Sequence, residues 1–286
     1  MFKFYLYKLG QFLVNRLPLP VAYSITSFVS TMQYYLSIRD RHAVQSNLKC
    51  IVPDAKNIPF LAREVFRNFG KYLADFFRMA KNMDKKYIEN NVKLVNRHYI
   101  DDVLKKGKGG IILTAHIGNW ELGGVVLTTL GYPLAAIALP HKERPVNDLF
   151  NNQRESKGVV IVPTSIAIRK CLEYLKANRL VALLADRDFG LHGVALDFLG
   201  KKTMIPKGPA VFCLKTGAPI IPAFVIRNPD ETFTLTCEEP IFPPPVEHLD
   251  EDAALLDIMK KYTLIIENVV RKFPTQWLMF REFWIK

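Results

Sequence analysis

Two side chains that can move protons stand five positions apart in TAHIGNWELGG, residues 114–124: His116 and Glu121. An imidazole can take a proton from a hydroxyl near neutral pH, and a carboxylate beside it can fix its tautomer and stabilise the imidazolium that forms. The spacing alone identifies nothing, because His192 and Asp197 repeat it in HGVALD. Five helical residues also turn about 140° net, so a helix does not bring the two side chains together. The pair is an acid/base site only if a turn joins them.

The residues around His116 predict such a turn. GGIILTA, residues 109–115, is a short apolar run typical of a buried strand, and a helical spacing of apolar residues begins after Asn119. His116 then lies at the carboxyl end of the strand, Gly118 and Asn119 form the bend with Asn119 as the N-cap, and Glu121 lies in the first helical turn. Ligands of open α/β sheets bind at this edge. The alternative is a structural histidine, hydrogen-bonded in a turn. The repeat in HGVALD lies in a glycine-punctuated loop without this geometry.

The elements that must position these residues are helical up to about residue 107 and alternate afterwards. A strongly amphipathic helix is expected at 61–81, with a basic stripe that is usually a solvated face. The later strands are expected at 109–115, 134–139, 158–162, 180–185, 219–226 and 232–238. The later helices are expected at 119–130, 145–157, 164–177, 207–216 and about 252–272. This alternation predicts an α/β fold with a mixed, largely parallel central sheet flanked by helices.

The amino-terminal residues have a membrane-associating character. Residues 2–14 are rich in Phe, Tyr and Leu, carry Lys3 and Lys8, and are too short to span a bilayer. An uncharged segment, 21–38, is amphipathic and fits a core helix, an interfacial anchor or a single span. No small-residue cleavage site of a signal peptide follows it. We therefore predict a membrane-associating segment at 1–40 and an α/β domain at 41–286.

Composition narrows the classes of partner. The 286 residues carry a formal net charge of +12, which points to an acidic partner. Nucleic acid is not expected, because there is no metal-ligand Cys/His spacing, no aromatic run of an RNA-binding sheet and no dense basic helix. An anionic membrane, a phosphorylated lipid or an acidic carrier protein remain. The four cysteines have no paired spacing and are expected to be reduced core residues. We expect neither a metal nor a cofactor.

Two further segments carry polar side chains. LLADRDFG, residues 183–190, ends a buried strand in Asp186, Arg187 and Asp188, either as part of a site or as a salt-bridged turn. Its DFG letters do not indicate a kinase, because the other kinase motifs are absent, and no G-x-S-x-G elbow provides a serine nucleophile. Residues 198–210 are expected to form a lysine-bearing loop before a helix, which is either an anion site or an ordinary surface loop.

In chain order, a set of motifs resembles the lipid A biosynthesis acyltransferase family, within the wider lysophospholipid acyltransferases. The family's HX4D/E motif matches HIGNWE. Further matches are Asn47 and Pro53 in SNLKCIVPD, and Asn147, Arg154 and Gly158 in RPVNDLFNNQRESKG. The remaining matches, which together cover most of the chain, are NRLPLP, DRDFG, FLG and GPA within 198–210, TGAPIIPAF and FPTQWLMFREFW.

The resemblance implies direct transfer of an acyl chain from a thioester to a lipid hydroxyl, with His116 as general base and Glu121 as its partner. It implies substrate-binding roles for Arg154, Asn147 and Asp186, and the bend of Gly118 and Asn119 is a candidate site for the thioester oxyanion. Arg154 suits a phosphate on the acceptor.

The donor implied is an acyl-carrier protein or acyl-CoA, and the acceptor is a lipid A precursor or related phosphorylated glycolipid. The expected location is the cytoplasmic face of a bacterial inner membrane, either monotopic or with a single span. Another lipid acceptor, such as a lysophospholipid, a phosphoinositol mannoside or an aminolipid, is the alternative within enzymes. A non-catalytic lipid-binding protein of the membrane surface is the alternative from another class.

Overall fold

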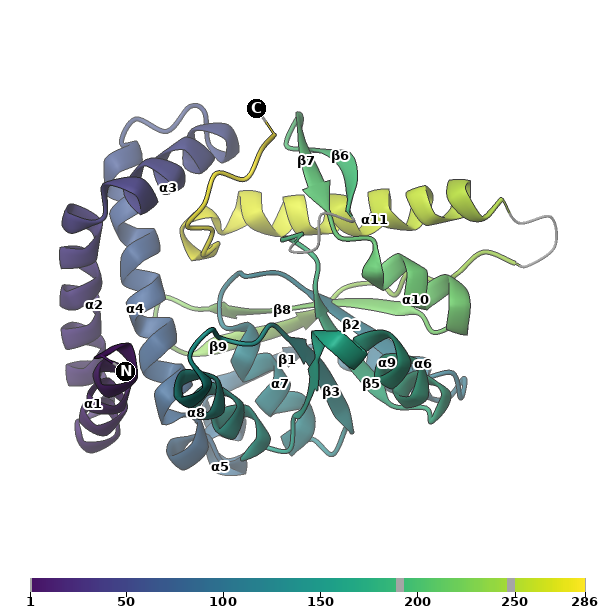
Figure 1. Ribbon diagram of the computed structural model, residues 1–286, viewed down its shortest axis with the longest axis horizontal. Helices are drawn as coiled ribbons and strands as arrows, with labels where there is room; N and C mark the ends of the chain where they lie inside the picture. The colour runs from purple at the N-terminus through teal and green to yellow at the C-terminus, as the bar shows by residue number, and fades with distance from the viewer. Residues whose placement is uncertain (1, 189–192, 246–249, 286) are drawn as a thin grey trace.

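The computed structural model describes residues 2–188, 193–245 and 250–285 (Figure 1). Its amino-terminal part is helical, as the sequence predicts, and α1 and α2 lie side by side with α4 at one end of the molecule (Figure 1). The helices of this part are α1 (Phe2–Arg16), α2 (Leu19–Leu36), α3 (Ile38–Ile51), α4 (Ile58–Asn82) and α5 (Lys85–Asn91).

The long helix α4 joins the amino-terminal helices to the rest of the fold. Its start is fixed by Asn57, whose side chain accepts a hydrogen bond from the N–H of Phe60 at 3.0 Å. Its apolar side includes Val65, Phe66 and Phe76, each at most 1% exposed. At Gly70 a Cβ would lie 2.4 Å from the Oγ of Ser30, so this glycine allows α2 to approach closely.

Within the described residues, seven strands form the main sheet, in the order β1-β9-β8-β2-β5-β3-β4. All neighbouring pairs are parallel except β8 and β9, which confirms a mixed, largely parallel sheet. The strands are β1 (Val92–Val95), β2 (Gly110–Thr114), β3 (Leu134–Ala138), β4 (Val160–Pro163), β5 (Leu180–Leu184), β8 (Ile220–Arg227) and β9 (Phe233–Cys237). The strand β1 is unexpected, because the sequence pattern predicts helix up to about residue 107.

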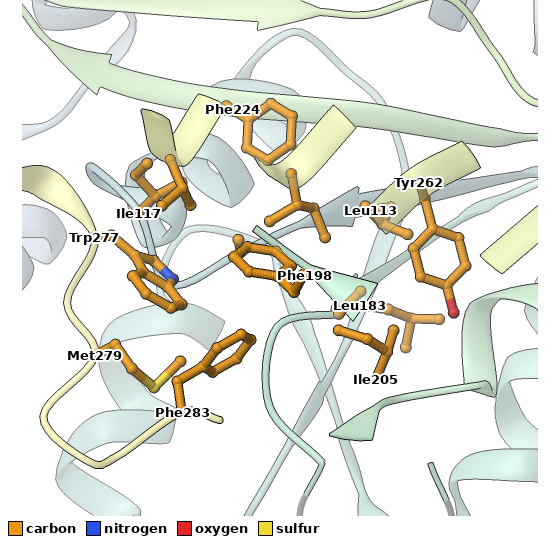
Figure 2. Close-up of a cluster of buried hydrophobic side chains, with 14 of the residues drawn as sticks. Leu113, Ile117, Leu183, Phe198, Ile205, Phe224, Tyr262, Trp277, Met279 and Phe283 are labelled. Carbon is orange, nitrogen blue, oxygen red and sulfur yellow. The ribbon is translucent and has the colours of Figure 1, made fainter. Parts of the chain in front are cut away.

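Helices cover both faces of the sheet, because successive side chains of a strand point to opposite faces. Ile111 and Leu113 of β2 belong to the core beneath α9, α10 and α11, whereas Ile112 belongs to the core beneath α6, α7 and α8. Figure 2 shows part of the first core, in which Leu113 lies near Leu183 and Tyr262. These helices are α6 (His98–Leu104), α7 (Trp120–Thr129), α8 (Arg144–Glu155), α9 (Ala167–Lys176), α10 (Gly208–Thr216) and α11 (Glu251–Lys272).

A hairpin of β6 (Val194–Phe198) and β7 (Lys201–Ile205) replaces most of the loop that we expected at 198–210. That expectation is wrong because Leu199 and Gly200, at φ of 54° and 77°, form the two-residue turn that joins adjacent antiparallel strands. The buried ring of Phe198 packs against Trp277 and Phe283 of the carboxyl-terminal segment (Figure 2). His192, the rival of His116, lies outside the described residues.

The outer faces of α1 and α2 expose large apolar side chains, whereas Tyr23 and Tyr34 on the inner face of α2 are buried. The segment that the sequence marks as membrane-associating therefore packs on α4 by one face and leaves an apolar face uncovered. No helix among the described residues combines the length and apolarity that a membrane span needs. The exposed side chains are Tyr5, Leu6, Leu9, Phe12, Leu13, Val21, Ile25, Phe28, Val29, Met32, Tyr35 and Leu36.

Candidate active site

His116 lies just beyond the carboxyl end of β2, in the turn that the sequence predicts. Gly118 has a φ of +60°, and a Cβ there would lie 1.9 Å from the carbonyl oxygen of Val225, so only glycine fits this bend. Asn119 caps α7 by accepting a hydrogen bond from the N–H of Leu122 at 3.0 Å. The strand-turn-helix unit therefore has the geometry predicted from the sequence, with Glu121 in the first turn of α7.

The partner of the His116 imidazole is Asp186, from the turn after β5. The Nδ1 of His116 lies 2.7 Å from Asp186 Oδ1, and Asp186 Oδ2 accepts the backbone N–H of His116 at 2.9 Å. The indole N–H of Trp277 donates to the same Oδ2 at 2.9 Å. Because β2 and β5 are neighbouring parallel strands with Thr114 opposite Leu184, the residues two positions further along are brought together.

Asp186 is held in its ionised form. Its burial raises the pKa, but the charge of His116, the hydrogen bond with it, the charge of Arg187 and the Trp277 hydrogen bond lower the pKa to about 2. A carboxylate has no proton to donate, so Nδ1 of the neutral imidazole carries the hydrogen that is shared with Asp186. The other ring nitrogen, Nε2, is then free to accept a proton.

Glu121 pairs with Arg154 of α8 instead of with His116. The Nε of Arg154 lies 3.0 Å from Glu121 Oε2, and its Nη2 lies 2.6 Å from Glu121 Oε1, which is a two-pronged ion pair. The guanidinium lies 5.6 Å from the centre of the Phe76 ring. Both side chains are largely buried, at 16% and 11% exposure for Arg154 and Glu121.

The expected contact between His116 and Glu121 is therefore corrected: Asp186 holds the imidazole. The physical reason is the start of α7, which places Glu121 beside α8 and its cation while the ring of His116 meets the neighbouring strand end. We expected Arg154 to bind an acceptor phosphate through two N–H groups, but its Nε and Nη2 bind Glu121 instead. Its Nη1 lies 3.4 Å from Asn151 Oδ1.

The bend does not supply free amides for an oxyanion. The N–H of Gly118 donates to the carbonyl of Gln276 at 3.0 Å, and that of Asn119 donates to the carbonyl of Val225 at 2.8 Å. Our expectation of an oxyanion site at these two groups is wrong, because they bind the chain to β8 and to the carboxyl-terminal segment. Asn147 lies outside the cavity lining, where its Oδ1 accepts the N–H of His141 at 3.1 Å.

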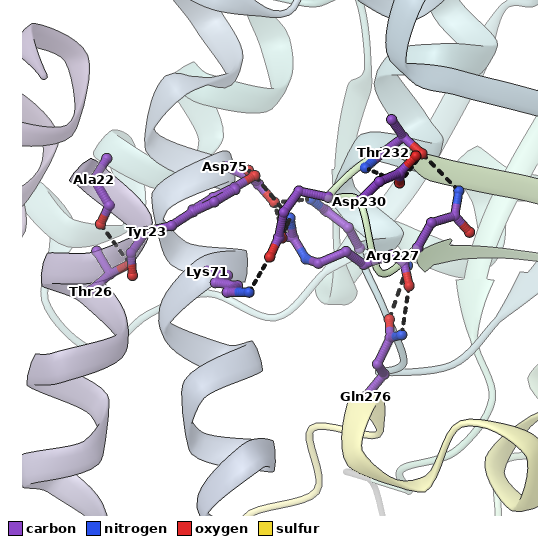
Figure 3. A network of polar contacts seen from close by, with 12 residues as sticks. Ala22, Tyr23, Thr26, Lys71, Asp75, Arg227, Asp230, Thr232 and Gln276 are labelled. Atoms are coloured by element: carbon purple, nitrogen blue, oxygen red, sulfur yellow. Dashed lines mark hydrogen bonds and ion pairs between the residues drawn. The ribbon is translucent and has the colours of Figure 1, made fainter. Parts of the chain in front are cut away.

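A buried polar network joins Tyr23, Asp75 and Arg227 beside α4 (Figure 3), and it reaches the bend through the side chain of Asn119. Asp75 of α4 accepts hydrogen bonds from Tyr23 of α2 at 2.5 Å and from the side chain of Asn119 at 3.0 Å, and it pairs with Arg227. Arg227 also donates to the Tyr23 hydroxyl at 2.8 Å. The side chain of Asp75 is 0% exposed and that of Arg227 is 8% exposed, so the network lies in the interior. Tyr23, Asp75 and Arg227 were not predicted from the sequence, because they are scattered over more than 200 positions.

The ion pair and the His116 ring border a cavity of about 870 Å³, within the size range of ligand pockets. Its lining is mainly apolar, and the elements that contribute to it include α4, α7, α8, α10, the strands β2, β3, β5 and β8, and the carboxyl-terminal segment. Polar groups also line it, among them His116, Glu121, Arg154 and Arg187. An acyl chain fits such a lining, because its burial there releases apolar surface from water.

Arg187, which the sequence places in the strand-end cluster with Asp186, also lines the cavity. Its Nη2 donates to the carbonyl of Leu278 at 2.5 Å, and its Nε has no hydrogen-bond partner among the described residues. Burial lowers the pKa of Arg187, which the charge of Asp186 opposes. The DRDFG letters were the only available signal, and they place Arg187 next to Asp186 at the strand end.

The cysteines do not provide a nucleophile at this site. Cys171, Cys213 and Cys237 are free thiols in the core, as predicted, and Cys50 is a partly exposed free thiol. Burial raises the pKa of Cys171 to about 11 and that of Cys213 to about 12, so these thiols are protonated at neutral pH. The arrangement at the cavity instead suits proton abstraction by an imidazole.

Comparison with known proteins identifies relatives of the chain. Residues 1–286 match the family model described as bacterial lipid A biosynthesis acyltransferase. The chain is 28% identical to a phosphatidylinositol mannoside acyltransferase of Mycolicibacterium smegmatis over 222 residues, which cover 76% of this chain and 72% of the relative. It is 24% identical to a lipid A biosynthesis acyltransferase of Haemophilus influenzae over 145 residues, which cover 50% of this chain and 46% of the relative. The crystal structure of a 1-acyl-sn-glycerophosphate acyltransferase from Thermotoga maritima aligns at a TM-score of 0.42 and 15% identity, covering 89% of this chain and 99% of that one.

Proposed function

This chain belongs to the bacterial lipid A biosynthesis acyltransferase family and is an acyltransferase, and from that premise we propose that it acylates a hydroxyl of a glycolipid from a thioester donor, with His116 as general base. The observation that carries the proposal is the His116–Asp186 contact of 2.7 Å in the wall of an apolar cavity. A positioned base that is oriented by a buried carboxylate is the arrangement that activates a hydroxyl.

The proposed step needs no covalent enzyme intermediate. Nε2 of His116 takes the proton of the acceptor hydroxyl as its oxygen attacks the thioester carbonyl carbon. The tetrahedral intermediate then collapses, the C–S bond breaks, and the imidazolium returns the proton to the leaving thiolate. Asp186 keeps the proton on Nδ1 and stabilises the imidazolium. Arg187 provides positive charge near the reacting carbonyl oxygen, in the role that we expected of the bend amides.

The Glu121–Arg154 pair forms the opposite part of the site in this proposal. Hydrogen bonds to Glu121, the Phe76 ring and the contact of Nη1 with Asn151 fix the guanidinium, so the second N–H of Nη1 can meet an acceptor without reorganising. We propose that this group contacts a phosphate or hydroxyl of the acceptor headgroup. Asn147, in contrast, is proposed to act only through the loop at His141, whose N–H it binds.

A lipid A precursor or related glycolipid is the proposed acceptor, because the chain is similar to a lipid A biosynthesis acyltransferase and to a phosphatidylinositol mannoside acyltransferase. A phosphoinositol mannoside is the second candidate, favoured by the longer match to the mycobacterial relative. The proposed donor is acyl-carrier protein or acyl-CoA. We propose that residues 1–40 dock on an anionic membrane by the exposed apolar face of α1 and α2, at the cytoplasmic side of a bacterial inner membrane, with 41–286 as the catalytic domain.

The test is transfer from radiolabelled acyl-carrier protein or acyl-CoA to a panel of lipid A precursors, phosphoinositol mannosides and lysophospholipids, with products identified by mass spectrometry. His116→Ala should lose at least 10²-fold in turnover, which is the lower end of what a general base contributes. His98→Ala is the matched control, because His98 is exposed on α6, away from the cavity. Turnover by His116→Ala equal to that of the control would refute the base, and wild-type lipid binding without any transfer would favour a non-catalytic lipid-binding protein.

A further inference from the structure

A second cavity, separate from the candidate active site, lies between α2 and α4 near the turn that joins β8 and β9. It has a volume of about 780 Å³, and we call it the α2–α4 groove. Three basic residues of α4 line it: Arg63, Arg67 and Lys71. These residues follow each other at intervals of four, so they lie along one side of the helix. Nothing in the proposed transfer reaction uses this basic stripe.

The charges in the groove are unevenly compensated. Lys71 pairs with Glu231 in the turn after β8, and Arg67 pairs with Glu64 of its own helix at 2.9 Å. Arg63 has no ion pair in the described part of the chain, and its guanidinium lies over the Phe60 ring at 5.5 Å. Asp230 also lines the groove. Because Glu231 compensates Lys71 and Glu64 compensates Arg67, Arg63 marks the positive end of the basic stripe.

Two polar atoms in the groove wall have no partner. The hydroxyl of Ser27, a residue only 6% exposed, makes no hydrogen bond among the described residues, and neither does the buried Nε of Arg63. A buried polar group without a partner costs about 1 to 3 kcal/mol, so such groups are normally satisfied by protein groups, by water or by a ligand. A hydroxyl and a guanidinium that lack partners are both donors, and donors suit a phosphate.

The groove opens beside the exposed apolar face of α1 and α2. Phe28 belongs to both, because it lines the groove and is 63% exposed. Val29 and Ile25 continue the exposed face along α2, at 59% and 41% exposure. A ligand with a phosphate in the groove could therefore lay an apolar tail along this face. Free phosphate has no such tail, whereas a phospholipid has both parts.

We propose that the α2–α4 groove binds the phosphate of an anionic phospholipid headgroup at its Arg63 and Arg67 end, with the acyl chains along the apolar face of α2. Ser27 donates a hydrogen bond to this phosphate, and the lipid is neither the acyl donor nor the acceptor. Binding there adds a specific contact to the general attraction between a chain of net charge +12 and an anionic membrane. The site goes beyond the proposed transfer reaction and does not depend on it.

The experiment measures sedimentation of the full chain with vesicles of phosphatidylcholine containing a fixed fraction of phosphatidylglycerol. The double variant Arg63→Gln/Arg67→Gln should bind about thirty-fold more weakly, because it loses the attraction of two cations to an anionic surface. The matched control is Lys176→Gln/Lys260→Gln, which removes the same charge from exposed positions of α9 and α11. Equal loss in both double variants would show attraction by net charge alone and would overturn the site.

The Ser27→Ala variant separates a headgroup site from a charged surface, since it removes a donor without changing the charge. It should weaken binding to phosphatidylglycerol vesicles several-fold and leave binding to vesicles of phosphatidylcholine unchanged. Unchanged binding to both would overturn the phosphate contact. Binding of inorganic phosphate that is lost in Ser27→Ala, while vesicle binding by this variant equals that of wild type, would show that a free phosphate, not a lipid, occupies the groove. Transfer to a detergent-dispersed acceptor should be the same in all these variants, whatever the outcome for the proposed reaction.

Discussion

Replacing Asp186 by asparagine is the sharpest test of how His116 is held. The carboxylate accepts three hydrogen bonds, two at Oδ2 from the His116 N–H and the Trp277 indole, and one at Oδ1 from the imidazole. The single carbonyl oxygen of an asparagine is best placed at the Oδ2 position, where it keeps two donors. Its amide nitrogen then faces Nδ1 of His116 and donates to it. The hydrogen of the neutral ring must move to Nε2, the nitrogen that we propose as the base.

The magnitude follows from that tautomer change. Loss of the correct tautomer in a carboxylate-imidazole pair lowers turnover by roughly 10³- to 10⁴-fold, or about 4 to 5 kcal/mol of activation free energy. The ionised carboxylate is itself favoured in the folded state. The pKa of about 2 in the folded protein, against the ordinary 3.8, corresponds to about 2 kcal/mol of stability. The effect on turnover should therefore be larger than the effect on stability.

The assay is turnover of Asp186→Asn at saturating donor and acceptor, beside its thermal unfolding midpoint. We expect kcat to fall while KM for both substrates changes little, because the cavity lining is unaltered. Glu121→Gln is the comparison, since it changes the other carboxylate of the site without touching the ring. Turnover of Asp186→Asn within tenfold of wild type, in a folded protein, would refute the role of Asp186. A larger loss in Glu121→Gln than in Asp186→Asn would restore Glu121 as the partner.

Four further outcomes are expected. Glu121→Gln should lower the free energy of unfolding by roughly 3 kcal/mol because it strands the buried Arg154 cation, and unchanged denaturant unfolding would contradict this. Gly118→Ala should destabilise the protein several times more than Gly107→Ala. The φ angle is positive at both positions, but of the two only Gly118 would bring a Cβ against a backbone oxygen, and equal unfolding midpoints of the two variants would contradict this. The double variant Phe12→Ser/Val29→Ser should bind vesicles at least tenfold more weakly without loss of stability, because these side chains are 56% and 59% exposed. Vesicle binding equal to that of wild type would place the docking face elsewhere. The stability that Asp186 provides through its lowered pKa should be complete above about pH 4 and lost as the pH falls through about 2. The free energies of unfolding of wild type and Asp186→Asn, measured against pH, should therefore converge at about pH 2.

The fold was largely predictable because its central strands are buried on both faces. Such strands are continuous apolar runs, and GGIILTA is an example. The strand β1 was missed because VKLV is four residues long and lies at the edge of the sheet, so it carries little pattern. The hairpin was missed because its lysines and glycines are typical of a loop, while its register depends on the turn at Leu199 and Gly200.

The position of His116 was predictable, whereas its partner was not. A strand end, a glycine bend and a helix cap are local features of the sequence. The contact with Asp186 spans 70 positions and depends on β2 and β5 being neighbours in the sheet, which no local pattern specifies. Glu121 was assigned to the ring because it is near in sequence, and only the packing of α8 against α7 shows that Arg154 is its counterion.

The network around Asp75 bears on how far the amino-terminal helices can be exchanged. Tyr23 of α2 donates to the same carboxylate that holds Asn119 in the active-site bend. A chimera that received α1 and α2 from a relative with another residue at this position would leave Asp75 and Arg227 with an unfilled contact in the interior. The two helices are therefore not freely interchangeable, because a graft between relatives would require Tyr23 of α2 and its partners Asp75 and Arg227 to be transferred together.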